Sequence, residues 1–204
     1  RRRTSQLEWG VSGQRVFDGG VFDFDLARRH GVSWRGAQDD FEDAQDGGPT
    51  LRPRIWSLSM SSQHEFRVGE RAWRFSPGVH AQRTADTTLS IDQIAIAGRG
   101  SVRASDGDVV LLAENGYAWR NELTTPLSAW PGADLMAVFA LDHGRVWGAS
   151  AAQLSGQSLT GAAFGLRGRH DAAFFEAMVA FPLRQPAAFA GRQPTAYLSL
   201  SYAF

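Results

Sequence analysis

The last ten residues of the chain, 195–204, alternate strictly between two kinds of side chain. Successive side chains on a β-strand point to opposite faces, so one face of this strand carries Ala196, Leu198, Leu200, Tyr202 and Phe204. A strand with one apolar face and one small or polar face fits the wall of an outer-membrane β-barrel, which meets lipid outside and water inside. Taken alone, the segment also fits the edge strand of a soluble β-sandwich.

The same pattern recurs along the chain in segments of about nine to twelve residues, the length that a tilted transmembrane strand needs. This repetition favours an all-β fold, an antiparallel transmembrane β-barrel of the outer membrane. About nine strands are predicted, at Thr4–Arg15, Gly20–Arg29, Arg52–Gln63, Arg71–Gln82, Gly116–Thr125, Asp134–Trp147, Ser158–Arg167, Ala172–Phe181 and Thr195–Phe204.

The connections between these strands alternate between short and long. Outer-membrane barrels have tight periplasmic turns and larger extracellular loops, whereas a soluble sandwich has no reason to sort its loops in this way. The short joints are Val16–Gly19, His64–Glu70, Pro126–Ala133 and Gly168–Asp171, and the long ones are His30–Leu51, Arg83–Asn115, Gly148–Gln157 and Pro182–Pro194.

Charged residues within the predicted strands indicate which faces point into the water-filled lumen. Glu176 lies midway along its strand, opposite the face formed by Phe175 and Val179. A carboxylate on a spanning strand is tolerated where it faces the water-filled lumen. Arg120 and Glu122 share one face of their strand, so all three are predicted lumenal charges.

Composition excludes several classes of function. Basic and acidic residues balance at 21 each, so no net field recruits nucleic acid, and cysteine is absent, so no disulfide or thiolate metal site forms. The histidines are scattered without metal-ligand spacing, and no metal or cofactor is predicted. They are His30, His64, His80, His143 and His170.

Two further motifs and the first residues of the chain do not indicate a ligand-binding site or a secretory signal. Gly98-Arg99-Gly100 lacks the helix and Lys-Ser/Thr of a phosphate loop, and the acidic stretch 39–46 departs from calcium-loop spacing. The chain opens on Arg1-Arg2-Arg3 without a secretory signal, as a mature secreted chain or an excised fragment would. No nucleophile–base pair or paired-carboxylate constellation is recognisable, so an enzyme is not expected.

Several motifs, in one order, resemble the haemolysin-activator, or two-partner secretion, family of outer-membrane transporters. The resemblance covers residues 91–204 well and the first ninety residues only by strand pattern. The motifs are 91–103 (IDQIAIAGRGSVR), 115–123 (NGYAWRNEL), 141–146 (LDHGRV), 159–168 (LTGAAFGLRG) and Pro182-Leu183 followed by the terminal strand.

The resemblance implies a sixteen-stranded barrel preceded by two periplasmic domains that capture an unfolded exoprotein. Residues 1–204 would then be the C-terminal portion of that barrel, with residues 83–115 as the long extracellular loop that folds into the lumen. The capture domains are absent from this chain.

The resemblance also implies a pair between the loop and the barrel wall. In the family an arginine in a Val-Arg-Gly-aromatic tip pairs with an aspartate on a neighbouring strand. Here Val102-Arg103 matches the first half, and the aspartate would be Asp142. Ala104-Ser105 replaces the usual glycine and aromatic, so three outcomes are open: a weakened pair, a differently placed tip, or two solvated charges.

The leading function is therefore a protein translocation pore that secretes a large partner exoprotein. The alternatives are a barrel-assembly insertase of the same superfamily and a passive porin or adhesin barrel. The expected partners are the unfolded exoprotein, outer-membrane lipid and the barrel-assembly machinery, with no nucleic acid. An aromatic C-terminal strand resembles the signal that this machinery reads, here Phe204, Tyr202 and Leu200.

Overall fold

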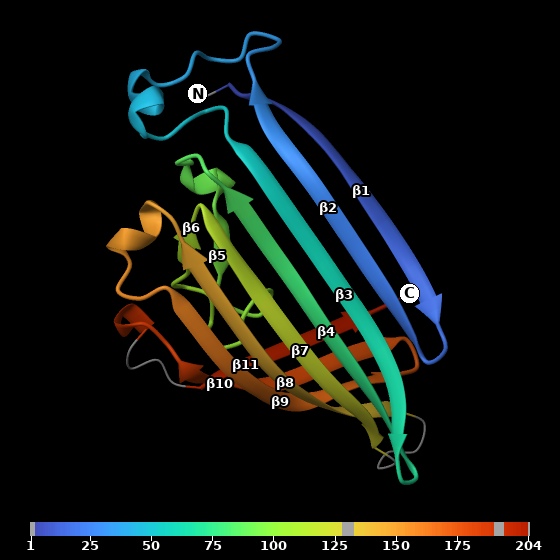
Figure 1. Ribbon diagram of the computed structural model, residues 1–204. Coiled ribbons are helices and arrows are strands. Elements are labelled where there is room, and N and C mark those ends of the chain that lie inside the picture. The colour runs from blue at the N-terminus through green and yellow to red at the C-terminus, as the bar shows by residue number, and fades with distance from the viewer. Residues whose placement is uncertain (1–2, 128–132, 190–193, 204) are drawn as a thin grey trace.

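The computed structural model describes residues 3–127, 133–189 and 194–203, and β-strands dominate it. Nine long strands form one antiparallel sheet that curls into part of a barrel wall, with β1 and β11 at its edges (Figure 1). Its order is β1 (Ser5–Phe17), β2 (Gly20–Val32), β3 (Arg54–Val68), β4 (Arg71–Thr84), β7 (Asn115–Leu127), β8 (Ala133–Trp147), β9 (Ser158–His170), β10 (Ala173–Arg184) and β11 (Thr195–Tyr202).

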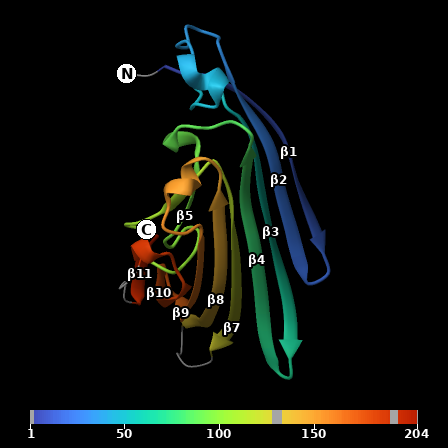
Figure 2. The same cartoon turned by 60° about the vertical axis from the view of Figure 1, so that its left-hand side comes forward.

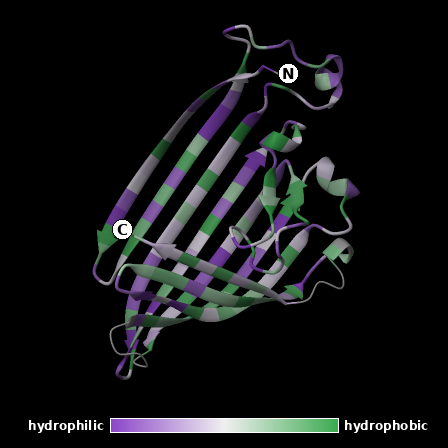
Figure 3. Cartoon of the chain, turned by 180° about the vertical axis from the view of Figure 1, so that it is seen from behind, coloured by the Kyte–Doolittle hydropathy of each residue, from purple (hydrophilic) through white to green (hydrophobic). Residues whose placement is uncertain are grey.

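The strands form because their residues alternate between the two faces of the curled sheet. Hydrophilic and hydrophobic residues follow one another along the strands (Figure 3). On the convex face, large apolar side chains such as Trp9, Val11 and Leu198 are exposed, while the opposite face carries Glu122 and Asp142. Exposed apolar side chains on one face are typical of a wall that meets lipid. The predicted all-β barrel wall is confirmed.

Short turns lie at one end of the sheet, here called the turn end. β1 and β2 are joined by Asp18-Gly19, and β3 and β4 by Gly69-Glu70. Gly19 and Gly69 have φ angles of 73° and 61°, in the left-handed region that glycine adopts without a steric penalty. The joint between β7 and β8, residues 128–132, lies outside the described residues.

Four longer connections lie at the other end, here called the loop end, so the predicted alternation of short and long connections is confirmed (Figure 1). The first, 33–53, holds the 3₁₀-helix η1 (Glu42–Asp46). The second, 85–114, holds η2 (Ser90–Asp92), β5 (Ile94–Ile96) and β6 (Leu111–Ala113). The third and fourth, 148–157 and 185–194, hold η3 (Ser150–Gln153) and η4 (Ala187–Phe189).

The main apolar core lies inside the curl, between the 85–114 segment and the concave face of the sheet (Figure 2). Ile96 and Val102 of that segment are fully buried, and they pack in one cluster with Ala118, Val146 and Leu159 from β7, β8 and β9. The core is therefore made by a loop folded against strands.

The structure corrects some predicted boundaries. The joint predicted at His64–Glu70 is only two residues long, because β3 continues to Val68 and pairs with Arg71. The 83–115 connection was predicted as a loop, yet it contains a two-stranded sheet formed by β5 and β6. Three-residue strands carry too few residues to display an alternating pattern.

No helix in the described parts of the chain is long and apolar enough to cross a membrane.

Candidate functional site

The 85–114 segment enters the concave side of the sheet as a hairpin and ends in a buried tip. β5 and β6 pair through Ile94↔Ala113 and Ile96↔Leu111. Beyond β5, the Ser101 hydroxyl bonds both the N–H and the carbonyl of Ala97, which closes a tight turn. The four residues that follow, Val102 to Ser105, are at most 2% exposed. This buried stretch, residues 102–105, is called the loop tip below.

Arg103 of the loop tip forms a bidentate salt bridge with Asp142 of β8. Its Nε donates to Asp142 Oδ2 at 2.7 Å and its Nη2 to Oδ1 at 2.9 Å, while the Arg103 backbone N–H also donates to Oδ2 at 3.1 Å. Arg103 is 2% exposed and Asp142 is fully buried. Parallel guanidinium–carboxylate bonds combine charge with fixed geometry. The structure thus brings together the two residues of the predicted loop-to-wall pair.

The charges continue from this pair across four strands and back to the loop. Arg103 Nη1 also bonds Glu122 of β7 at 2.8 Å, and Glu122 bonds Arg167 of β9 at 2.7 Å. Arg167 lies 2.6 Å from Glu176 of β10, and Glu176 accepts a bond of 2.6 Å from Arg99, in the loop again. Acid and base alternate at every step, so each charge has an opposite neighbour.

The predicted lumenal charges all lie on the concave face, but they do not form one group. Arg120 is two residues from Glu122 on the same face of β7, yet Glu122 pairs with Arg103 and Arg167 instead. Arg120 Nη1 donates to the Gly100 carbonyl at 3.3 Å, and its buried Nε has no hydrogen-bond partner among the described atoms. Arg120 and Glu122 therefore share the concave face, as the alternation predicts, but they have different partners.

Three glycines, one on each of three neighbouring strands, make room for the inserted segment. They are Gly116 of β7, Gly144 of β8 and Gly161 of β9. A Cβ at Gly116 would lie 2.8 Å from Ile94, and one at Gly144 would lie 2.9 Å from Ile96. We call these glycines the loop seat. Sequence reasoning missed them, although their place on the wet face of each strand was a usable signal.

The loop tip makes a further contact with the last strand. Tyr197 of β11 donates its hydroxyl hydrogen to the Ser105 carbonyl at 2.5 Å. Ala104 and Ser105, which depart from the family pattern, are 1% and 0% exposed. The departure therefore leaves the tip buried against the wall, and the alternative of two solvated charges is wrong.

The base of the 85–114 segment is held by polar groups that sequence reasoning also missed. Glu114 is 2% exposed and accepts bonds from the backbone N–H and the hydroxyl of Ser150. Gln82 of β4 donates to the carbonyls of both Asp92 and Glu114, and Arg29 of β2 forms an ion pair of 2.9 Å with Asp92. These contacts fix where the segment leaves and rejoins the wall.

The predicted assembly signal lies partly outside the described residues. Leu200 and Tyr202 are 75% and 67% exposed on the convex face of β11, as the alternation predicts. Phe204 lies outside the described residues.

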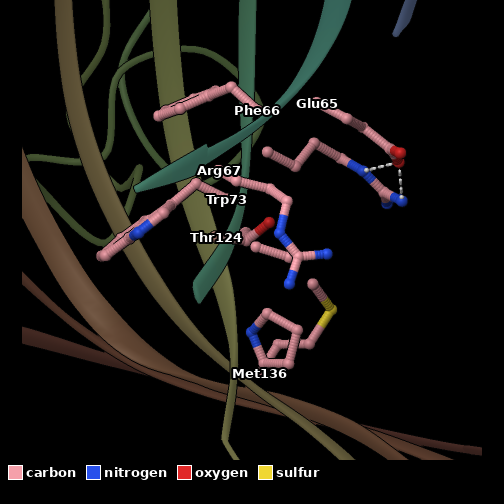
Figure 4. Close-up of a pocket in the computed structure, with 9 residues that line it drawn as sticks. Glu65, Phe66, Arg67, Trp73, Thr124 and Met136 are labelled. Carbon is pink, nitrogen blue, oxygen red and sulfur yellow. Dashed lines mark hydrogen bonds and ion pairs between the residues drawn. The ribbon is translucent and has the colours of Figure 1, made fainter. Parts of the chain in front are cut away.

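A separate pocket of about 290 Å³ lies at the turn end of β3, β4, β7 and β8 (Figure 4). Its lining includes Arg67, Trp73, Thr124 and Met136, and Glu65 pairs there with Arg74 at 2.6 Å. None of the predicted site residues lines it. Across the residues that the structure describes, no group of three or more His, Cys, Asp or Glu side chains could hold a metal ion.

Comparison with known proteins decides the family. The model of the haemolysin secretion/activation proteins ShlB/FhaC/HecB matches residues 1–168. The chain belongs to this family. It is 32% identical to the outer membrane transporter CdiB-2 of Burkholderia pseudomallei strain 1026b over 96% of this chain. It is 31% identical to the outer membrane transporter CdiB of Escherichia coli over 100% of this chain.

Solved structures agree with this family assignment. The chain superposes on CdiB from Escherichia coli with a TM-score of 0.88 and 28% identity over its whole length, which is 37% of the CdiB chain. CdiB from Acinetobacter baumannii, at 21% identity, shares the fold over 97% of the chain with a TM-score of 0.80, covering 33% of that CdiB. The chain spans about one third of the curated relatives that it matches, at 33% and 34%. As in these relatives, its place is the outer membrane.

Proposed function

We propose that this chain supplies part of the barrel wall and the inserted loop of a pore that secretes a large partner exoprotein to the cell surface. The observation that carries the proposal is the buried loop tip, held by Arg103 on Asp142 and Glu122. Membership of a secretion and activation family supports the same function.

In this proposal residues 83–115 form an extracellular loop that occupies part of the lumen, and the loop end of the sheet faces the cell surface. Arg103 and Asp142 hold the loop on the wall. Exposed apolar residues of the convex face, such as Trp9 and Leu198, meet lipid. The terminal strand, with Leu200, Tyr202 and Phe204, is read by the barrel-assembly machinery.

The decisive experiment deletes the whole transporter that contains this chain and measures the large partner exoprotein in the culture medium. We expect the exoprotein to stay with the cells and to return to the medium when the transporter is restored. A fall in many other outer-membrane barrels would instead indicate an assembly insertase. Normal protein release, with only the uptake of small solutes reduced, would indicate a passive porin.

A further inference from the structure

The inner wall has two sectors of different chemistry. The inserted segment covers β7 to β9, where glycine, alanine and valine receive it, and it also reaches β10 and β11 through Glu176 and Tyr197. The inner faces of β2 to β4 carry small polar side chains instead. We call this second sector the polar wall, and its members are Asp23, Asp25, Ser57, Ser59, Ser61, Gln63, Ser76 and His80.

Registers place the polar wall on the inside. Gln82 pairs with Gly116 of the loop seat, and Ser76 pairs with Glu122, so these residues share the concave face. Ser59 lies opposite His80, and its hydroxyl is 3.0 Å from His80 Nδ1. The next residues along β3, Leu58 and Met60, point to the convex face. On β3 and β4 the polar wall therefore carries hydroxyl, amide and imidazole groups with no large apolar side chain between residues 57 and 63.

A cleft of about 540 Å³ separates the inserted loop from this wall. Ser59, Gly78 and His80 line one side, and Ala97, Gly100 and Ser101 line the other. Ser59 and Ser61 are exposed although they face inwards. The seated loop therefore leaves Ser59 and Ser61 of the wall uncovered.

The chemistry of the wall suits an extended polypeptide in motion. A conducting surface must bind its cargo well enough to admit it and weakly enough to release it at each step. Serine hydroxyls both donate and accept hydrogen bonds, so they can exchange partners with successive peptide groups of a passing chain. Large aromatic side chains would instead offer apolar surface that holds the cargo in place.

We propose that the exported polypeptide moves in extended form along the polar wall of β2 to β4, beside the seated loop. This proposal rests on the proposed function and adds to it the path and the residues that line it. The seat strands β7 to β9 do not form the path, because the inserted segment covers their inner faces.

Cysteine scanning with a stalled substrate tests the path. This chain has no cysteine, so single Ser→Cys changes, which replace one oxygen by sulfur, can be made in a whole transporter freed of any other cysteine. Ser59→Cys and Ser61→Cys probe the polar wall. Ser199→Cys probes the inner face of β11 on the far side of the loop, and Ser62→Cys probes the convex face of β3, where Ser62 contacts His64. The substrate is the exoprotein with one cysteine, fused to a folded domain that cannot pass.

We expect roughly tenfold more disulfide crosslinking to the substrate at Ser59→Cys and Ser61→Cys than at Ser199→Cys or Ser62→Cys, since the yield follows the local concentration of the passing chain. Equal or greater yield at Ser199→Cys overturns the path, as does the absence of any crosslink to the substrate at both Ser59→Cys and Ser61→Cys. Export of the unfused exoprotein is measured first in each strain. If the cysteine-free parent exports none, the proposed function itself fails, and that result is distinct from crosslinks at the wrong strand.

Discussion

Gly161 of β9 lies directly beneath Arg103 of the loop tip, so closely that a Cβ on Gly161 would overlap the Arg103 carbonyl oxygen. The same Cβ would lie 2.7 Å from the Cβ of Ala104. Backbone and a short side chain cannot move aside as the end of a flexible side chain can. The loop tip therefore fits against the wall only because residue 161 has no Cβ atom.

The change Gly161→Ala should displace the loop tip from the wall. Overpacking of this kind costs about 1–3 kcal/mol, which favours conformations with the tip unseated. Measured in planar bilayers, the whole transporter should show larger or more frequent channel openings. Gly100→Ala is the matched control, because a Cβ there meets nothing within 4 Å. Equal conductance for the two variants would contradict the steric role of Gly161.

The change Tyr197→Phe should loosen the loop tip from the last strand. It removes the hydroxyl that bonds the Ser105 carbonyl and leaves a buried acceptor unpaired, at a cost of about 1–3 kcal/mol. We expect a smaller rise in channel openings than for Gly161→Ala. Tyr202→Phe is the control, since Tyr202 is exposed on the convex face. The same rise in both variants would show that the effect is not specific to the tip.

Acid should loosen the connections at the loop end. Asp86 accepts bonds of 2.7 Å from the backbone N–H of Arg54 and 2.6 Å from its guanidinium, and this pairing lowers the pKa of Asp86 below its usual range. A lowered folded pKa means that the pair stabilises the fold above the ordinary carboxyl pKa and is lost as the pH falls through the lowered value.

Hydrogen exchange, corrected for intrinsic rates, should therefore show residues 85–88 opening more readily as the medium is acidified through the carboxyl range. Asp86→Asn should open already at neutral pH and lose this pH dependence. Asp39→Asn is the control, because the Asp39 side chain is fully exposed and lies 3.7 Å from Arg52. Exchange that is independent of pH in the unaltered protein would exclude a role for Asp86.

The two faces of β11 should respond oppositely to a charge. Leu200 is exposed on the convex face and Ser199 lies opposite Glu176 on the inner face. Arginine on the lipid face of a barrel costs about 2–4 kcal/mol at the bilayer midplane, whereas lumenal positions are wet. Leu200→Arg should therefore lower outer-membrane abundance and heat-modifiable mobility, and Ser199→Arg should not. The reverse order would invert the assignment of faces.

The strands could be predicted from sequence because each one displays its alternation over about a dozen residues. The Arg103–Asp142 contact came from the resemblance, and the burial of Ala104 and Ser105 could not be foreseen from a departure in the motif. The contact from Arg167 to Glu122 depends on registers across β8, which lies between their strands. The alternation that turns Leu198 outwards puts Tyr197 on the inner face, yet its partner Ser105 is 92 residues away in sequence.

The loop-to-wall pair gives the strongest test of the site. Removing one member of a buried ion pair leaves an uncompensated charge and can cost about 3–5 kcal/mol. If the two residues acted independently, the losses from the two substitutions would add in the double variant. We expect Arg103→Ala and Asp142→Ala each to reduce secretion, and the double variant to be little worse than either. Arg103→Lys should also reduce secretion although it keeps the positive charge, because an ammonium cannot make two parallel bonds to Asp142. Secreted exoprotein, measured at matched barrel abundance, decides the matter. Additive losses, or normal secretion from either single variant, would mean that the buried contact does not hold the loop in function.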